Sequence, residues 1–154
     1  MAIDLEKLIT ATQLKGIKVW LEYPEAPGFE VEIAYIDKQE MMRIYQRSTI
    51  KRWNSQERKN EEELDRTKLT KELAERVVTS WRGLTVENLR RLYPVQVEGS
   101  IKPDDEIEPT FENRFALLNH STDFENWVVT VATTPTYFDN PEEKAKEEIK
   151  NLGK

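Results

Sequence analysis

Two runs of alternating apolar and polar residues near the start of the chain constrain its fold most strongly. The first run spans residues 17–23 and the second spans residues 29–36, with Pro24, Pro27 and Gly28 between them. A period of two places every second side chain on the same face of a strand, and proline and glycine favour turns. The pattern therefore predicts an antiparallel β-hairpin in this part of the chain.

Helices are expected elsewhere, because apolar residues recur at helical spacing next to residues that cap helices. Asp37 and Glu40 form the pattern of a capping box ahead of a helix that runs towards Lys51. Thr122 and Glu125 form a second such pair. The remaining expected helices lie in the first dozen residues, from Thr85 to Leu92, and after Thr110.

One longer apolar stripe lies in the middle of the chain. Leu69, Leu73, Val77 and Trp81 recur every four residues, and Gly83 follows them. This spacing predicts a single helix that Gly83 ends, because glycine commonly occupies the position after a helix C-terminus.

The chain of 154 residues is long enough for one hydrophobic core and too short for two. We expect one α+β domain over residues 1–138, in which an N-terminal β-hairpin or small antiparallel sheet packs against a C-terminal helical bundle. Residues 139–154 are expected to form a peripheral C-terminal helix or tail. Large apolar residues at helical spacing usually face the core, so the expected core includes Trp81, Leu89, Phe115 and Trp127.

Two stretches carry many charges and few large apolar residues. Residues 51–66 alternate in sign and contain only Trp53 and Leu64 as large apolar side chains. Residues 98–110 are mainly acidic and contain one glycine and two prolines. Charged stretches without an apolar face are poorly suited to burial, so both are expected to be exposed loops.

The sequence lacks the residues that common catalytic and metal sites require. It contains no cysteine, which excludes disulfides, thiolate metal sites and cysteine nucleophiles. Its single histidine, His120, has no serine nucleophile motif beside it, and no glycine motif for nucleotide phosphates is present. The acidic runs at residues 61–65 and 104–108 lack the spacing of a calcium loop. We therefore expect no catalytic residue, no metal and no cofactor.

Charge and hydropathy also limit the partners. A net charge of −6 argues against a surface built to bind phosphates, although residues 47–53 combine basic groups with an aromatic, as single-strand binding sites do. The chain does not start with a basic and then apolar signal, and no stretch approaches the length of a bilayer span. Nucleic acid is therefore the weaker alternative, and a cytoplasmic protein without a membrane partner is expected.

Some apolar residues do not fit a single core. Trp20 and Ile36 fall on the hairpin face opposite the regular apolar residues, so either helices cover both faces or that face receives a partner. Methionine side chains adapt to varied surfaces, although they serve equally well in a core. The candidate partner-binding residues are Trp20, Met41, Met42 and Trp53.

Several short motifs follow one another in a characteristic order. They are Tyr23-Pro24, Pro27-Gly28-Phe29, Ala34-Tyr35-Ile36, Glu61-Glu62-Glu63-Leu64-Asp65, Trp81-Arg82-Gly83-Leu84, Phe111-Glu112-Asn113, Leu117-Leu118 and Ser121-Thr122-Asp123-Phe124-Glu125-Asn126-Trp127-Val128. Over residues 15–132, their order and spacing resemble those of the tail assembly chaperones of long-tailed bacteriophages and prophages. No catalytic residue is among them.

This resemblance implies a non-enzymatic role in virion assembly. Such chaperones bind the long, helical and apolar tape measure protein, keep it soluble and help to recruit tail tube subunits around it. They act in the host cytoplasm and are absent from the finished virion. The resemblance leaves self-association open. A nucleic-acid-binding accessory protein of phage or prophage origin and a small enzyme of unknown type remain the alternative functions.

Overall fold

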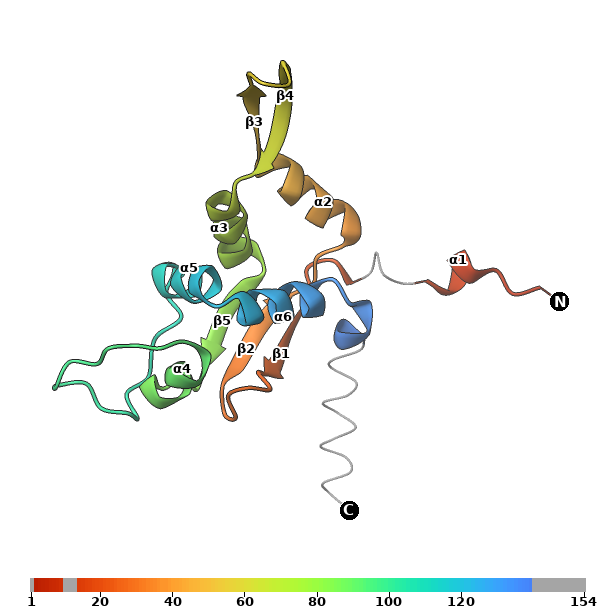
Figure 1. Cartoon of the computed structure of the whole chain (residues 1–154). Coiled ribbons are helices and arrows are strands. Elements are labelled where there is room, and N and C mark those ends of the chain that lie inside the picture. The colour runs from red at the N-terminus through yellow and green to blue at the C-terminus, as the bar shows by residue number, and fades with distance from the viewer. Residues whose placement is uncertain (1, 10–13, 140–154) are drawn as a thin grey trace.

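The computed structural model describes residues 2–9 and 14–139 (Figure 1). Within these residues the protein is α+β, with a three-stranded antiparallel sheet, a separate two-stranded hairpin and several helices. The fold class expected from the sequence is therefore confirmed. The expected C-terminal helix or tail, residues 139–154, lies outside the described residues except for its first residue.

The predicted N-terminal hairpin forms two of the three strands of the main sheet. β1 (Lys18–Glu22) pairs antiparallel with β2 (Glu30–Ala34), and β2 pairs antiparallel with β5 (Val78–Arg82). Val31 and Ile33 are fully buried, whereas the other residues of β2 are partly exposed, as strand alternation requires. The hairpin prediction is therefore confirmed, and a strand from the middle of the chain extends the sheet.

Three helices begin at the caps that the sequence predicted. The side chains of Asp37, Thr85 and Thr110 each accept a hydrogen bond from a backbone N–H in the first turn of the helix that follows. These helices are α2 (Lys38–Arg47), α4 (Val86–Leu92) and α5 (Phe111–His120).

The cap of the next helix, α6 (Thr122–Ala132), is one residue earlier than expected. Ser121, and not Thr122, accepts the hydrogen bond from the N–H of Phe124. Two short helical turns complete the described chain: α1 (Leu5–Leu8) near its start and η2 (Pro135–Phe138) after α6.

The single helix predicted over the middle apolar stripe is wrong in its second half. α3 (Arg66–Arg76) carries the first two residues of the stripe, but the chain leaves the helix at Val77 and continues as strand β5. β-branched residues favour strands, and β5 gains hydrogen bonds to β2 by leaving the helix. Trp81 therefore packs on the sheet, with its ring 5.9 Å from that of Phe29.

The charged stretch 51–66, predicted to be an exposed loop, is exposed but has regular structure. β3 (Thr49–Asn54) and β4 (Lys59–Leu64) form a hairpin, here called the arm, which projects away from the main sheet and the helices (Figure 1). The alternation in this stretch involves charges and not apolar residues, so it gives a weak strand signal. The N–H of Asp65 donates a hydrogen bond to the carbonyl of Ser48 and closes the base of the arm.

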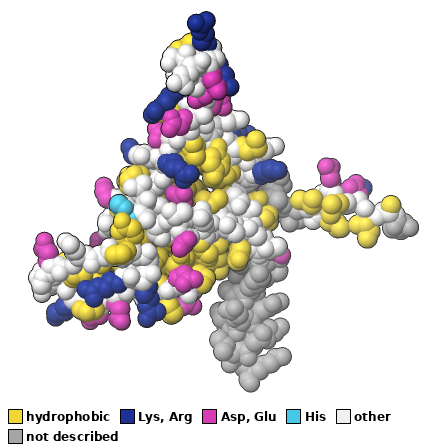
Figure 2. All heavy atoms as spheres, in the orientation of Figure 1, with side chains coloured by type: hydrophobic (Ala, Val, Ile, Leu, Met, Phe, Trp, Pro, Cys, Tyr) yellow, Lys and Arg dark blue, Asp and Glu magenta, His cyan; other side chains and the backbone are white. Residues whose placement is uncertain are grey.

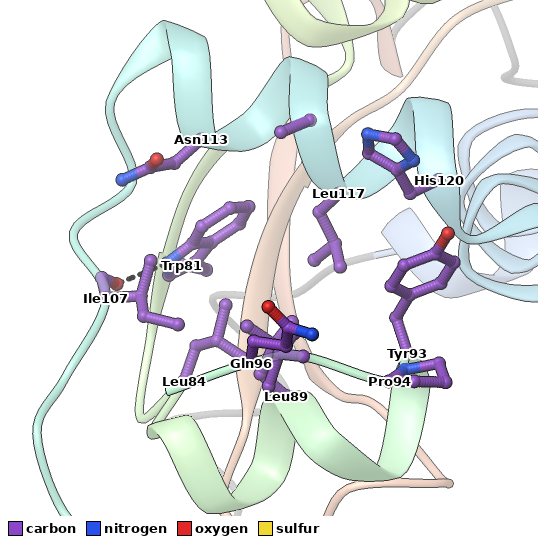
Figure 3. Close-up of a pocket in the computed structure, with 12 residues that line it drawn as sticks. Trp81, Leu84, Leu89, Tyr93, Pro94, Gln96, Ile107, Asn113, Leu117 and His120 are labelled. Carbon is purple, nitrogen blue, oxygen red and sulfur yellow. Dashed lines mark hydrogen bonds between the residues drawn. The ribbon is translucent and has the colours of Figure 1, made fainter. Parts of the chain in front are cut away.

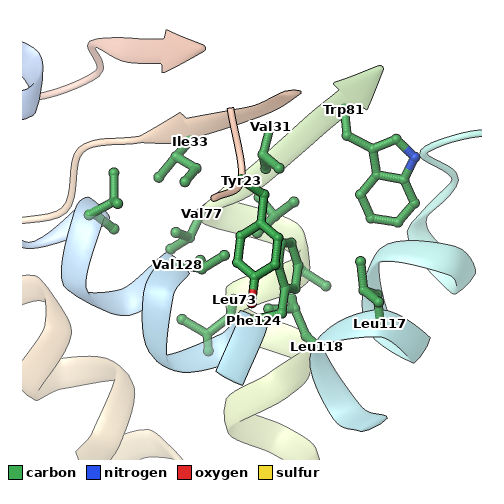
Figure 4. Packing of buried hydrophobic residues seen from close by; sticks show 14 of the residues in the cluster. Tyr23, Val31, Ile33, Leu73, Val77, Trp81, Leu117, Leu118, Phe124 and Val128 are labelled. Carbon is green, nitrogen blue, oxygen red and sulfur yellow. The ribbon is translucent and has the colours of Figure 1, made fainter. Parts of the chain in front are cut away.

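The core lies between the main sheet and helices α3, α5 and α6 (Figure 4). Its centre is aromatic: the rings of Phe29 and Phe124 stack at 5.9 Å, and Tyr23 meets Phe124 edge-on at 5.4 Å. Such pairs add to the free energy gained from apolar burial. Of the four residues expected in the core, Trp81 is buried, and the other three are partly buried against the same cluster: Leu89, Phe115 and Trp127.

Candidate partner-binding surface

An apolar hollow lies between α4 and α5, close to the end of β5 (Figure 3). Its volume is about 350 Å³, and leucines supply much of its floor. A hollow of this size and character is typical of sites that take an apolar side chain or a small ligand. We call it the α4–α5 pocket, and it is lined by Trp81, Leu84, Leu89, Tyr93, Pro94, Val95, Gln96, Ile107, Asn113, Ala116, Leu117 and His120.

One wall of the pocket is a face of α5. Asn113, Ala116, Leu117 and His120 follow one another at intervals of three, one and three residues, which places them on the same side of the helix. Thr110 fixes where this helix begins, because its hydroxyl accepts a hydrogen bond from the N–H of Asn113. The single histidine of the chain therefore lies at the rim of an apolar hollow.

The opposite wall comes from α4 and the residues after it. Proline disfavours helical backbone at the residue before it, and Tyr93, which precedes Pro94, is accordingly extended with φ −157° and ψ 139°. The chain turns away from the helix at this point and runs along the pocket with Val95 and Gln96. The Tyr93-Pro94 pair thus ends α4 early enough to leave the hollow open.

The third side of the pocket is formed by Ile107, which belongs to the acidic loop, residues 98–110. This loop contains no helix or strand. Hydrogen bonds fix it to the fold: the N–H of Ile107 donates to the carbonyl of Leu84, and the indole N–H of Trp81 donates to the carbonyl of Ile107, each across 2.8 Å. Near the end of the loop, Nδ2 of Asn113 donates to the carbonyl of Glu108 across 2.8 Å. The loop is therefore an anchored rim of the pocket.

A second and more polar hollow, of about 360 Å³, adjoins the first. Tyr93 and His120 line the α4–α5 pocket, and their chain neighbours Leu92 and Ser121 line the second hollow. The rings of Tyr93 and His120, which lie 5.3 Å apart, therefore mark the boundary between the two hollows. Together the two hollows follow the seam between the end of α4 and the α5–α6 corner. The polar hollow is lined by Tyr23, Pro24, Glu25, Arg91, Leu92, Ser121, Asp123 and Trp127.

Tyr23 gives the polar hollow a neutral hydroxyl. Burial raises the pKa of its phenol above the ordinary value of 10.0, and the carboxylates of Asp123 and Glu25 raise it further. Arg91 adds a guanidinium to the same lining. The apolar α4–α5 pocket is therefore continued by a hollow that offers a hydroxyl, carboxylates and a guanidinium.

The structure does not bring the four predicted partner-binding residues together. Met41 is buried in the core, so it is no longer part of a candidate surface. Trp20 lies on the sheet with the guanidinium of Arg82 stacked 4.4 Å from its ring. Met42 on α2 is 53% exposed and Trp53 on the arm is 63% exposed, so these two remain accessible apolar side chains.

Sequence reasoning missed the α4–α5 pocket. Its lining residues come from β5, α4, α5 and two connecting segments, so no single run of the sequence contains it. Two signals pointed towards it: the helix stop at Tyr93-Pro94, and the acidic stretch from residue 98 that forms one wall.

Two of the basic residues that suggested nucleic-acid binding, Arg47 and Arg52, pair with carboxylates within the protein. Arg47 Nη2 lies 3.0 Å from Glu72 Oε2, and the hydrogen bond to Glu72 raises the pKa of Arg47. On the arm, Arg52 Nε lies 2.8 Å from Glu63 Oε2. A nucleic-acid phosphate would have to displace these carboxylates, which weakens the case for such a site.

Other kinds of site find little support in residues 2–9 and 14–139. No group of three or more histidine, aspartate or glutamate side chains there could hold a metal ion, and no helix there is long and apolar enough to cross a membrane. Comparison of the chain with protein-family models, curated proteins and solved structures gave no match in any of the three.

Proposed function

We propose that this protein is a tail assembly chaperone of a long-tailed phage or prophage. In this role it binds the tape measure protein in the host cytoplasm, keeps it soluble and helps to recruit tail tube subunits, and it is absent from the finished virion. The order of sequence motifs over residues 15–132 supports the family, and the open α4–α5 pocket is the structural observation that carries the binding role.

The physical problem that such a chaperone meets is the self-association of a long helical chain with apolar stripes. A partner that covers part of a stripe raises the solubility of the chain. An apolar pocket between two helices can take the ridge of a third helix, which is a common mode of peptide recognition. The α4–α5 pocket, lined mainly by apolar side chains, provides such a place.

Exposed apolar side chains outside the pocket supply additional contacts. Met42 lies on α2 and Trp53 on the arm, and the base of the arm follows directly after α2. Both side chains keep more than half of their surface accessible. We therefore assign them to a secondary contact with the same partner.

Nucleic-acid binding has less support as an alternative. The chain carries a net charge of −6, and the arginines at residues 47 and 52 are paired with carboxylates. Retention on single-stranded or duplex DNA at low salt, lost as salt rises, would favour that alternative.

Co-expression with the tape measure protein of the same genome tests the proposed function. We expect the soluble fraction of the tape measure protein, measured by sedimentation and immunoblot, to rise in the presence of this chain. An unrelated acidic protein of similar size serves as the control for nonspecific effects. Equal solubility with either protein would contradict the proposal.

A further inference from the structure

A strongly acidic segment of the chain runs beside the α4–α5 pocket. Residues 98–112 contain six acidic residues and one lysine, a net charge of −5, whereas the whole chain carries −6. Residues 19–37 also contain five acidic residues and no lysine or arginine, so residues 98–112 are one of two strongly acidic segments. A local excess of charge acts on the partners that approach it.

Geometry places this segment at the pocket itself. Ile107 and Asn113 belong to the lining, and the acidic residues Glu106, Glu108 and Glu112 are their neighbours in the chain and are exposed. The hydrogen bond from Trp81 to Ile107 and the bond from Asn113 to Glu108 hold the backbone at both points. The carboxylates are therefore carried by a fixed backbone.

The surface shows the same juxtaposition. On the face drawn in Figure 2, apolar side chains lie directly beside the single histidine, and both acidic and basic side chains lie further out in the same region. Arg91 lines the polar hollow and not the α4–α5 pocket. An apolar floor with an acidic rim is complementary to an apolar ridge with basic flanks.

We propose that the α4–α5 pocket binds an amphipathic helix whose apolar ridge is flanked by lysine or arginine residues. This inference rests on the proposed function in so far as the tape measure protein supplies the helix. The apolar ridge enters the pocket between α4 and α5, and its basic flanks meet the carboxylates of residues 98–112. Charge selects the partner and speeds its encounter, while apolar burial supplies most of the affinity.

A helix fits this place better than an added strand. Strand addition needs unpaired backbone groups at a sheet edge. Here the carbonyl of Leu84 and the N–H of Ile107 are bonded to each other, and the carbonyl of Ile107 also accepts the indole N–H of Trp81. The wall of the pocket therefore offers side chains, and recognition depends on the pattern of side chains in the partner.

Three synthetic peptides test the chemistry with the full chain. All are helical; the first has leucines along one ridge with lysine flanks, the second has the same ridge with glutamate flanks, and the third has lysine flanks and serines along the ridge. Fluorescence anisotropy measures binding at low and at high salt. We expect the first peptide to bind about tenfold more tightly than either of the others, with its advantage over the second reduced at high salt. Equal binding of the first and second peptides would overturn the proposal.

Two sets of variants locate the contact. Ala116→Trp fills the pocket from an exposed position on α5, and Thr130→Trp adds the same side chain at an exposed position outside both hollows. We expect only Ala116→Trp to lower the affinity for the leucine–lysine peptide, by about tenfold. Circular dichroism confirms that both variants fold, and unchanged binding by folded Ala116→Trp would overturn the assignment.

The charge variants follow the same plan. The triple variant Glu106→Gln, Glu108→Gln, Glu112→Gln removes three charges beside the pocket. The variant Glu57→Gln, Glu62→Gln, Glu75→Gln removes three exposed charges elsewhere. We expect the first triple to lose most of the preference for lysine flanks and the second to keep it, because exposed charges act over about a Debye length of 10 Å. Equal effects of the two triples would contradict the proposed role of the rim.

The tape measure protein separates this inference from the proposed function. If Ala116→Trp solubilises the tape measure protein as well as the parent chain does, the chaperone proposal stands and the pocket assignment fails. If the peptide binds as expected but the tape measure protein is not solubilised, the pocket assignment stands and the chaperone proposal fails. Self-association abolished by Ala116→Trp would assign the pocket to a second copy and overturn the helix proposal.

Discussion

The indole N–H of Trp81 donates a hydrogen bond to the backbone carbonyl of Ile107 across 2.8 Å. This contact joins a strand of the main sheet to the acidic loop. In addition, the N–H of Ile107 donates a hydrogen bond to the carbonyl of Leu84. Both the N–H and the carbonyl of Ile107 are thereby hydrogen-bonded to the rest of the fold. The rim of the α4–α5 pocket depends on this pair of bonds.

Replacement of Trp81 by phenylalanine tests that dependence. Trp81→Phe keeps an aromatic ring but removes the N–H donor, so we expect a loss of at least about 1 kcal/mol in the free energy of unfolding. Hydrogen exchange at the amides of Val86 and Ile107 should accelerate more than exchange within β2, because both amides bond across the loop contact. Trp20→Phe is the matched control, and equal exchange in the two variants would contradict the role of the bond.

Two glycines with similar backbone conformations give a second test. Gly16 has φ +85° and open space where a Cβ would lie, whereas Gly83 has φ +76° and a Cβ there would come 2.0 Å from the carbonyl oxygen of Gly28. Gly16→Ala should cost about 1–2 kcal/mol from the left-handed backbone alone. Gly83→Ala should cost clearly more in urea denaturation, because the connection between β1 and β2 must also move. Equal losses would mean that the close approach is not maintained in solution.

The aromatic core gives a third prediction. Phe124 is fully buried, so Phe124→Ala should cost about 3–5 kcal/mol of unfolding free energy. Trp127 stacks on Phe124 at 6.1 Å but is only partly buried and borders the polar hollow. Trp127→Ala should therefore cost less than Phe124→Ala, as measured by chemical denaturation. The reverse order would show that the centre of the core lies at Trp127.

Parts of this fold could be predicted because their signals are local. Alternation within residues 17–36 was enough for the hairpin, and side-chain caps such as Asp37 and Thr110 were enough to start helices. In each case the residues that decide the structure are neighbours in the chain. Local hydrogen bonds and a short period then suffice.

Other parts could not be predicted because their causes lie far away in the sequence. Residues 78–82 match a helical stripe, and they form a strand because β2 offers a pairing edge. The α4–α5 pocket likewise depends on the relative placement of β5, α4, α5 and the acidic loop. A pattern within one segment does not tell which segments will lie together. The helix stop at Tyr93-Pro94 and the acidic stretch from residue 98 were the two local signals.

A fourth prediction concerns high pH. Burial raises the pKa of Tyr23 in the folded state above 10.0, so its protonated form is favoured by folding. The stability from this group is complete below the pKa of the unfolded chain and is lost as pH rises through the higher folded pKa. Stability should thus decline from about pH 10 upwards, and Tyr23→Phe should reduce the decline in denaturation series at several pH values. Burial also raises the pKa of Tyr35, so the double variant with Tyr35→Phe should reduce it further. A decline of the same size in all three proteins would contradict this cause.

The fifth prediction separates stability from partner contact at Met42 and Trp53. Both side chains are more than half exposed, so the double variant Met42→Ser, Trp53→Ser should change the free energy of unfolding by no more than about 0.5 kcal/mol per site. Because we propose these residues as secondary contacts for the tape measure protein, they should matter when the two proteins are co-expressed. We expect a lower soluble fraction of the tape measure protein with the variant than with the parent chain. Unchanged solubilisation would place the secondary contact elsewhere.

The order of the sheet has a consequence for the synthesis of the chain. β2 needs β5 as its second neighbour, the N–H of Ile36 donates to the carbonyl of Ala132 across 2.9 Å, and Phe138 packs on Tyr35 at 5.3 Å. At about 5–20 residues per second, ribosomes need roughly 5–20 s to pass from the end of the hairpin to the residues that cover it. Throughout that interval the nascent hairpin lacks the segments that cover Val31 and Ile33, and such exposed apolar surface is prone to aggregation.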